Sequence, residues 1–507
     1  MSENKRIAKN TLFLYLRMLL TMVVSLYTSR IVLAKLGVAD YGTYNVVGGV
    51  VAVFTFLNSS MGGATSRFLT FALGKDDKIE LQKTFSATLT IHILIAFIIL
   101  ILAETVGLWF LENKLVIAPE RMNAARIVYQ LSIISTMITI AQVPYNATII
   151  AHERMNIYAY VEILNTFLKL GIVYLLIVGN WDKMVLFALL TLIVSIIISA
   201  VYMLYCVNKF EESKYKFEWD KKIIYPILSF SVWNMVGCGA VAGATQGVNI
   251  LLNLFFGAVV NAARGVAVQV NGTITAFVNN FQTAVNPQIV KLYAAGKMNE
   301  LFTLVFQNAK FSFSIMWLLL LPISLKMETI LHIWLVEVPE YTALFCRLVL
   351  IQSLISCVQR PFVMAIHAMG RIKVLQLTAG TILLSVLPIS YFFLKAGGQP
   401  YIPFAVYILC TMLEFSCEIY LLKRWINLSI ISLFKTVFLP QALIILCTLP
   451  FSLLVSHYTN FIFTTLFSAL SVCLSVYFIT FNKETRIKLI YQLKNIIKNK
   501  YYGNKIN

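Results

Sequence analysis

Apolar stretches of about twenty residues or more follow one another along the chain, separated by short polar joints. About twenty helical residues cross the hydrocarbon core of a bilayer, so this pattern predicts an all-α membrane protein. About fourteen transmembrane helices are expected, at residues 10–34, 41–73, 84–110, 124–150, 156–178, 184–207, 223–256, 260–290, 301–325, 341–366, 372–394, 401–422, 432–455 and 459–481.

The composition supports the same interpretation. Hydrophobic residues make up 59% of the chain and charged residues 12%, with a mean hydropathy of +0.80. Soluble domains carry about 25% charged residues, so a soluble multidomain protein is excluded. The eight cysteines form no CxxC pair and the five histidines are scattered, so we expect no disulfide framework, metal site or cofactor.

Positive charge is unevenly distributed over the predicted loops. Of the 41 lysines and arginines, 26 fall on the side of the membrane that carries both termini and seven on the other side. Because basic loops are retained in the cytoplasm, both termini are expected there. Residues 482–507 are interpreted as a basic amphipathic helix resting on anionic membrane lipids. The net charge of +19 therefore does not indicate nucleic-acid binding, because no soluble domain presents it.

A weak internal repeat relates the two halves of the chain. Residues 36–75 and 256–297 each begin at a hydrophobic–glycine pair, followed by a short turn, a Gly- and Val-rich span and a Gly–Lys pair. Six spans separate the copies, so both halves have the same orientation in the bilayer. We expect two pseudo-symmetric six-helix lobes at 1–207 and 223–424, a cytoplasmic linker at 208–222, helices 13 and 14 at 425–481, and the tail at 482–507.

Charged side chains inside the predicted spans are the candidate functional residues. A charge at the bilayer centre costs about 3 kcal/mol on insertion scales, so each should face a cavity or an opposite charge. The planar guanidinium of arginine matches phosphate oxygens in pairs. We therefore expect anion binding in a central cavity by Arg17, Arg30, Arg67 and Arg264. The alternative is that Arg30 and Arg67 reach the membrane interface or satisfy backbone carbonyls at a helix break.

The remaining intramembrane charges are candidates for charge pairs or for coupling to an ion gradient. Glu162 and Lys169 are seven residues apart, hence on one helix face, and are expected to pair. Glu414 and Glu418 also share a helix face. They are expected to neutralise two of the three cations in the second half, which are Lys310, Arg347 and Arg360. The sequence does not identify which of these charges pair with each other.

The opening of the chain, RIAKNTLFLYLRMLL followed by SLYTSRIVLAKLGVADYGTYNVVGGVVAVF, resembles the oligosaccharide flippases of bacterial polysaccharide biosynthesis (the O-antigen, or Wzx, type). These belong to the multidrug/oligosaccharidyl-lipid/polysaccharide exporter (MOP) superfamily. The resemblance is sharpest over residues 10–75, at Ser29–Arg30, Leu36–Gly37 and Tyr41–Gly42, and extends as topology over the whole chain. It implies a MATE-like, V-shaped transporter that alternates between inward- and outward-facing states.

The resemblance also implies a substrate and a location. The substrate would be an undecaprenyl-pyrophosphate-linked oligosaccharide, moved to the periplasmic leaflet of the bacterial inner membrane for O-antigen, lipopolysaccharide, capsule or exopolysaccharide synthesis. Related lipid II flippases use arginines of the first, second and eighth spans; Arg30, Arg67 and Arg264 lie in those spans, although their spacing to nearby glycines differs. Polysaccharide polymerase and chain-length regulators are implied partners, and no enzymatic activity is expected.

Two other functional classes fit the sequence less well. A cation-coupled multidrug antiporter of the same fold usually needs cavity carboxylates, whereas the spans of the first lobe offer mainly arginines, with Glu162 and Glu104 as acids. An integral-membrane polymerase or glycosyltransferase is disfavoured because the longest joints, 208–222 and 326–340, are short. The sequence leaves open the glycan, the coupling ion and the oligomeric state.

Overall fold

The computed structural model describes residues 3–52, 55–113, 117, 119–176, 181–217, 219–335 and 338–480, and every regular element in these segments is a helix. The predicted amphipathic tail lies outside the described residues. The elements are α1 (Glu3–Ala52), α2 (Thr55–Gly74), α3 (Lys78–Leu102), η1 (Ala103–Gly107), α4 (Leu108–Asn113), η2 (Pro119–Arg121), α5 (Met122–Ala151), α6 (Met155–Leu175), α7 (Lys183–Lys209), η3 (Glu211–Ser213), α8 (Lys221–Ala294), α9 (Met298–Leu325), α10 (Met327–Trp334), α11 (Thr342–Met369), α12 (Ile372–Leu384), α13 (Val386–Lys395), α14 (Ile402–Ile426), α15 (Ile430–Leu433), η4 (Phe434–Phe438), α16 (Leu439–Tyr458) and α17 (Phe461–Thr480).

Eleven helical segments in the described part are long and apolar enough to cross a membrane. Each coincides with one of the predicted spans, which confirms the expectation of an all-α, multi-pass membrane protein. Of the three other predicted spans, 10–34 falls in α1, 41–73 extends from the end of α1 into α2, and 260–290 falls in the second half of α8. The described residues of these spans are helical as well. The second half of α8 is rich in Asn and Gln, which lowers its hydropathy without preventing helix formation.

The chain forms two compact units whose boundaries cut across helices. Unit 1 contains residues 1–239, 283–301 and 364–377. Unit 2 contains residues 240–282, 302–363 and 378–507. The ends of α8 and α11, which come from the second half of the sequence, are therefore part of unit 1. The division into lobes at 1–207 and 223–424 stays a prediction.

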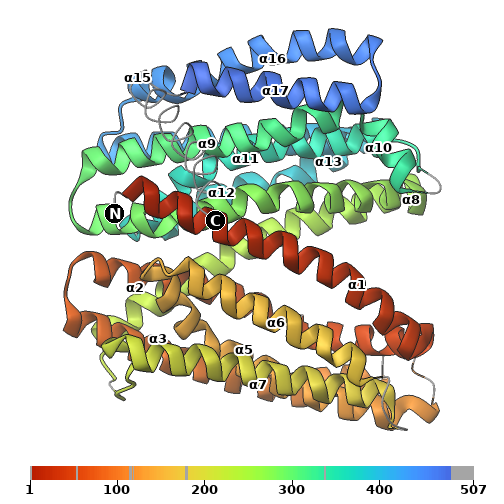
Figure 1. Ribbon diagram of the computed structural model, residues 1–507, viewed down its shortest axis with the longest axis vertical. Coiled ribbons are helices and arrows are strands. Elements are labelled where there is room, and N and C mark those ends of the chain that lie inside the picture. Colours follow the sequence, from red (N-terminus) through yellow and green to blue (C-terminus); the bar gives the residue numbers. More distant parts are fainter. Residues whose placement is uncertain are drawn as a thin grey trace, which may run out of the picture. The chain divides into compact units, whose positions relative to one another are not determined.

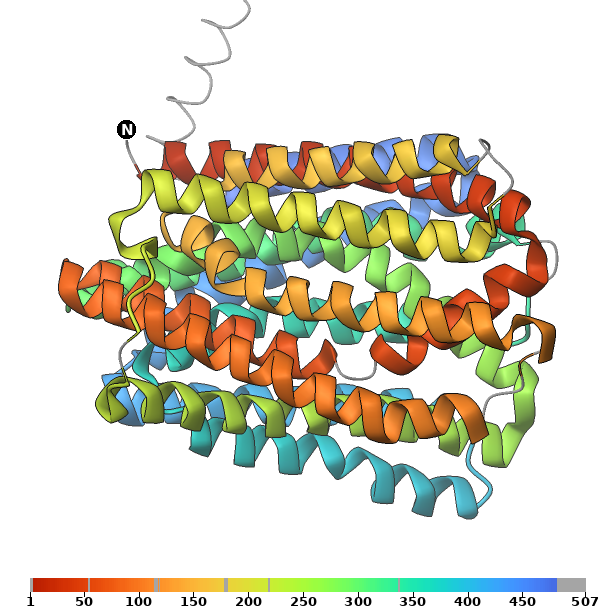
Figure 2. The same cartoon turned by 90° about the horizontal axis from the view of Figure 1, so that it is seen from below.

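Helices of unit 1 run roughly along one common direction, and α3, α5 and α7 lie side by side (Figures 1 and 2). Their apolar cores enclose large aromatic side chains, including the fully buried Phe85, Tyr129 and Tyr202. Helix starts are capped by aspartate: Asp77 accepts hydrogen bonds from the first amides of α3, and Asp182 does the same for α7. Such caps satisfy amides that have no partner within the helix.

Close helix packing joins α2 to the end of α8 within unit 1. A Cβ atom added at Gly74 would lie 2.9 Å from the Ala294 side chain and 2.9 Å from the Lys291 backbone, so only glycine permits this approach. The Phe71 and Tyr293 rings lie 6.5 Å apart beside it. This packing places side chains of α2 next to elements from the second half of the chain.

In unit 2, α16 and α17 form a helical hairpin at one edge (Figure 1). A stripe of small hydroxyl residues, Thr448, Ser452, Thr464 and Ser468, is buried in it, because these residues recur at four-residue spacing on each helix. The indole of Trp317 on α9 donates a hydrogen bond of 3.0 Å to the Thr448 hydroxyl. Helices that pack through small polar residues are typical of membrane proteins.

Candidate functional site

A polar cavity of about 290 Å³ lies between α1 and α6 in unit 1. These two helices are neighbours along much of their length (Figure 1). The cavity is lined by Arg17, Thr21, Val24, Thr28, Glu162, Asn165, Thr166 and Lys169. Two cations, one carboxylate, three hydroxyls and an amide therefore surround a space inside predicted membrane spans, where polar side chains are otherwise costly.

The spacing of these residues explains why they share the cavity. Those on α1 recur every three or four residues, and those on α6 span Glu162 to Lys169, which is two helical turns. Residues three, four or seven apart lie on the same helix face, so each helix presents one polar stripe. Glu162 and Lys169 accordingly both belong to the lining contributed by α6. These two stripes face each other across the cavity.

The charges in this cavity do not cancel. The Arg17 guanidinium lies over the Tyr158 ring, 4.9 Å from its centroid, and the Tyr202 hydroxyl donates a hydrogen bond of 3.2 Å to Glu162. Among the described residues no ion pair within 4.0 Å joins Glu162 to Lys169, so the expected pairing is not formed. The lining thus has two positive side chains and one negative one, and its net charge suits an anionic group.

Arg67 on α2 also belongs to unit 1 but is not part of the cavity lining. Its side chain is buried, with Nε and Nη2 donating hydrogen bonds of 2.9 Å to the carbonyls of His367 and Ala368 in the last turn of α11. Its guanidinium also lies 4.5 Å from the Phe68 ring centroid and 5.4 Å from that of Phe230. Arg67 therefore completes the carboxyl end of α11, where cations are favoured by unsatisfied carbonyls and the helix dipole.

Arg264 on α8 is also buried and donates a hydrogen bond of 2.6 Å from Nη2 to the carbonyl of Thr245. Nineteen residues of straight helix would separate these groups by about 28 Å, so α8 must turn back on itself between them. This contact joins the two predicted spans of α8 within the part that belongs to unit 2. Arg30 lies in the helical segment α1, but its side chain is outside the described part. Anion binding by Arg30, Arg67 and Arg264 stays a prediction.

Two of the three intramembrane cations of the second half, Arg347 and Arg360, have other partners than the acids named from the sequence. Arg347 donates to Glu328 Oε2 at 2.8 Å and to the carbonyl of Ser324 at 3.0 Å. Arg360 donates to the Asn279 side chain. Lys310 is half-buried on α9, and no ion pair with it is found in the described part of the chain.

Two carboxyl side chains of α14 lie one turn apart. Glu418 is buried, and its Oε1 accepts a hydrogen bond of 3.0 Å from the Gln359 amide of α11. Glu414 is half-buried. No described cation lies within 4.0 Å of either carboxyl, so the expected neutralisation by Lys310, Arg347 or Arg360 is not seen in this conformation.

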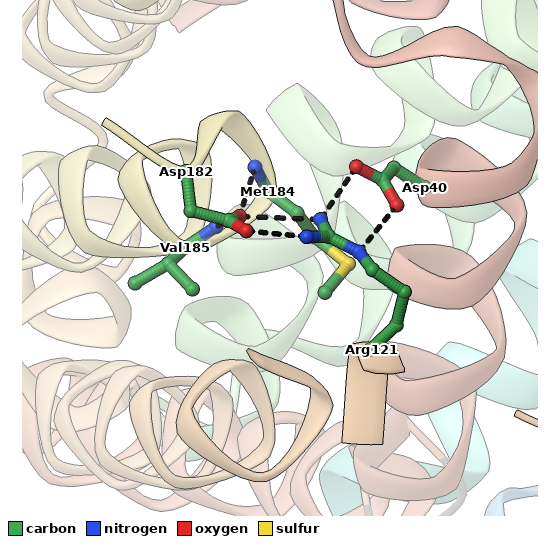
Figure 3. Close-up of polar contacts among 5 residues, drawn as sticks. All are labelled: Asp40, Arg121, Asp182, Met184 and Val185. Atoms are coloured by element: carbon green, nitrogen blue, oxygen red, sulfur yellow. Dashed lines mark hydrogen bonds and ion pairs between the residues drawn. The ribbon is translucent and has the colours of Figure 1, made fainter. Parts of the chain in front are cut away.

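A three-residue ion network at one end of unit 1 was missed from the sequence (Figure 3). Arg121 donates to Asp40 through Nε at 2.8 Å and to Asp182 through Nη1 at 2.5 Å. Burial by itself would raise the pKa of Asp182, but the Arg121 guanidinium and the amides of Val185 and Met184 outweigh it and lower that pKa. Helical periodicity gives no sign of this network, because Arg121 lies 81 positions from Asp40 and 61 positions from Asp182.

Glu153 is a second functional candidate that the sequence did not single out. It lies in the tight turn between α5 and α6, with a φ of 58°, and its side chain is fully buried. Lys291 Nζ donates to Glu153 Oε1 at 2.7 Å, and Gln288 Nε2 donates to Oε2 at 2.6 Å. Together with Arg67, it connects elements from the two halves of the sequence inside unit 1.

No family model matches this sequence, and no curated protein matches it significantly. Solved structures do resemble the fold. An outward-facing multidrug resistance MATE family transporter of the MOP superfamily aligns with a TM-score of 0.70 at 15% identity, over 84% of this chain and 96% of that one. A MATE protein in the straight conformation aligns with a TM-score of 0.68 at 15% identity, over 86% of this chain and 98% of that one.

A MOP superfamily transporter from Pyrococcus furiosus aligns with a TM-score of 0.68 at 16% identity, over 85% of this chain and 97% of that one. It is described as having a binding pocket of reverse polarity that suggests a different function. These likenesses extend over nearly the full length of each neighbour, and at such low identity they concern the arrangement of helices. The chain therefore has the fold of the MATE transporters of the MOP superfamily.

Proposed function

We propose that this protein is a flippase that moves a polyprenyl-pyrophosphate-linked oligosaccharide across the bacterial inner membrane by alternating access, from the cytoplasmic to the periplasmic leaflet. The observation that carries the proposal is the cavity between α1 and α6, whose two cations, Arg17 and Lys169, outnumber its one carboxylate. A pyrophosphate is the anionic part of such a lipid, and Arg and Lys are the side chains that bind phosphate oxygens.

The dimensions of the cavity restrict what it holds. A volume of about 290 Å³ lies just below the usual range of small-molecule pockets, which is about 300 to 1,000 Å³. It accommodates a headgroup such as pyrophosphate with an adjoining sugar, but not a complete oligosaccharide. The hydroxyls of Thr21, Thr28 and Thr166 and the amide of Asn165 supply hydrogen-bond partners for that sugar, and the polyprenyl chain stays in the lipid.

The fold supports a transport cycle without a chemical reaction. Transporters built from two repeated halves expose one site to each side of the membrane in turn. The excess of positive charge in the predicted loops on one side supports an orientation with both termini in the cytoplasm. The basic tail would then rest on the anionic lipids of the cytoplasmic leaflet. Polysaccharide polymerase and chain-length regulators are partners of the same proposal.

Reconstituted protein tests the proposal directly. In vesicles containing the lipid-linked oligosaccharide, wild-type protein is expected to expose the headgroup to the opposite leaflet, measured by its accessibility to an added lectin. Arg17→Ala and Lys169→Ala are each expected to weaken binding of inorganic pyrophosphate about tenfold or more, because each removes a charge-assisted hydrogen bond. Arg126→Ala is the matched control, since that exposed arginine pairs with Glu112 elsewhere.

A multidrug antiporter is the competing function, favoured by the MATE transporters among the fold neighbours and by Glu162 in the cavity. The two functions predict opposite effects of Glu162→Gln. Removing this carboxylate strengthens pyrophosphate binding if the ligand is an anion, and abolishes binding of an organic cation if the protein is an antiporter. Tight cation binding that depends on Glu162, with pyrophosphate binding unaffected by Arg17→Ala, would overturn the flippase proposal.

A further inference from the structure

Tyr202 on α7 contacts a charged residue of the cavity between α1 and α6 without lining that cavity itself. Helix α7 is a neighbour of α6 within unit 1. The Tyr202 ring is 0% exposed and belongs to an apolar cluster with Ile172, Val173 and Ile198. Its hydroxyl donates a hydrogen bond of 3.2 Å to Oε1 of Glu162, 40 positions away in the sequence. A buried, closely packed ring therefore fixes the position of this donor.

This hydrogen bond keeps the charges of the cavity apart. Among the described residues, the Tyr202 hydroxyl is the one hydrogen-bond donor found on the Glu162 carboxylate. Arg17 and Lys169 line the same cavity, yet in the described part of the chain neither forms an ion pair within 4.0 Å of Glu162. The Arg17 guanidinium lies instead over the Tyr158 ring, 4.9 Å from its centroid. The carboxylate is thus bonded toward α7 and not to either cation.

A carboxylate without this donor would turn toward the cations. Opposite charges attract more strongly in a partly buried cavity than in water, because the effective dielectric constant is lower. The hydrogen bond from a hydroxyl to an ionised carboxylate is one of the stronger hydrogen bonds in proteins, so it opposes that attraction. If Glu162 paired with Arg17 or Lys169, an entering anion would have to compete with the carboxylate for that cation.

We propose that Tyr202 is a positioning residue that sets the charge polarity of this cavity. It keeps the Glu162 carboxylate turned toward α7, so that Arg17 and Lys169 bind the phosphate oxygens of the substrate. In this role Tyr202 does not touch the substrate and acts through Glu162. The inference rests on the proposed function and deepens it, because it names the residue through which a cavity that contains a carboxylate selects an anion.

A double-mutant cycle on the full-length protein in detergent tests the inference. Tyr202→Phe keeps the buried ring and removes only the hydroxyl. It is expected to weaken binding of inorganic pyrophosphate by about tenfold, the effect expected for one hydrogen bond to a charged group. In the Glu162→Gln background the same change is expected to alter the affinity by less than about twofold, because no carboxylate remains to be released.

Tyr129→Phe is the matched control. Tyr129 is also fully buried in unit 1, and its hydroxyl donates a hydrogen bond of 2.7 Å to the carbonyl of Ala103, neither residue being part of the cavity lining. This variant is expected to keep the wild-type affinity for pyrophosphate. If Tyr202→Phe weakens binding equally with and without Glu162→Gln, its hydroxyl contributes only to helix packing, and the inference is overturned.

Infrared spectroscopy tests the contact without any ligand. The carboxylate stretching band that Glu162→Gln removes is expected to change frequency in Tyr202→Phe, because the frequency responds to hydrogen bonding. In Tyr129→Phe the band is expected to stay in place. An unchanged band in Tyr202→Phe overturns the inference.

The outcomes separate the two proposals. If the wild-type protein binds pyrophosphate and Tyr202→Phe binds it equally well, the inference is overturned and the flippase proposal stands. If the infrared band shifts in Tyr202→Phe but the wild-type protein binds no pyrophosphate, the flippase proposal fails, and the role of Tyr202 in anion selection fails with it.

Discussion

Arg67 offers the sharpest test of how the structure uses an intramembrane cation. The sequence predicts that this arginine binds an anion in a cavity, whereas the structure shows it bonded to two carbonyls at the end of α11. In Arg67→Ala those two carbonyls lose their donors. Each buried acceptor left without a partner costs about 1–3 kcal/mol, so we expect the free energy of unfolding to fall by about 3 kcal/mol.

Gly370 provides an independent check on the same contact. It has a φ of 75°, and a Cβ atom there would lie 2.8 Å from Arg67 Nη2. Gly370→Ala therefore combines backbone strain of about 1–2 kcal/mol with displacement of the guanidinium. In the Arg67→Ala background only the strain remains, so the two effects are expected to be less than additive.

The assay is reversible unfolding in mixed detergent micelles, followed by tryptophan fluorescence, for both single variants and the double variant. Arg126→Ala serves as the control, because an exposed arginine in a surface ion pair contributes less than about 1 kcal/mol. The reasoning is refuted if Arg67→Ala is as stable as this control and instead loses pyrophosphate binding. That result would return Arg67 to the anion-binding role predicted from the sequence.

Two further predictions concern unit 1. Gly74→Ala is expected to destabilise the protein by about 1–3 kcal/mol, because the added methyl group meets Ala294 and the backbone of α8. Gly171→Ala has open space around the added methyl group and is expected to stabilise α6 by about 0.5–1 kcal/mol. Unfolding of both variants in detergent measures the two effects, and equal effects would contradict the packing argument. Because the pKa of Asp182 is lowered in the folded state, its stabilising effect is fully present above its unfolded pKa of about 3.9 and is lost as the pH falls through the folded value. Thermal unfolding across the acidic range is expected to show a smaller loss of stability in Asp182→Asn than in wild type, and parallel curves would show that its bond with Arg121 contributes nothing.

Much of the fold was predictable from the sequence because membrane insertion depends on local composition. A run of about twenty apolar residues forms a helix wherever it lies in lipid, since its backbone groups must be satisfied within the segment. Eleven predicted spans were recovered in this way. The seven-residue spacing of Glu162 and Lys169 likewise predicts that both lie on one face of α6. These properties need no knowledge of which helices are neighbours.

The partners of the charges were decided by the tertiary structure alone. Arg67 bonds to a carbonyl 300 positions away, Arg121 bridges two acids 81 and 61 positions away, and Glu153 meets Lys291 across 138 positions. Composition and helical periodicity report on the face of one helix, whereas an ion pair requires two particular side chains to meet within about 4 Å. The local amino-acid composition therefore specifies the apolar spans. The packing of the helices decides which arginine completes a helix end and which one faces a cavity.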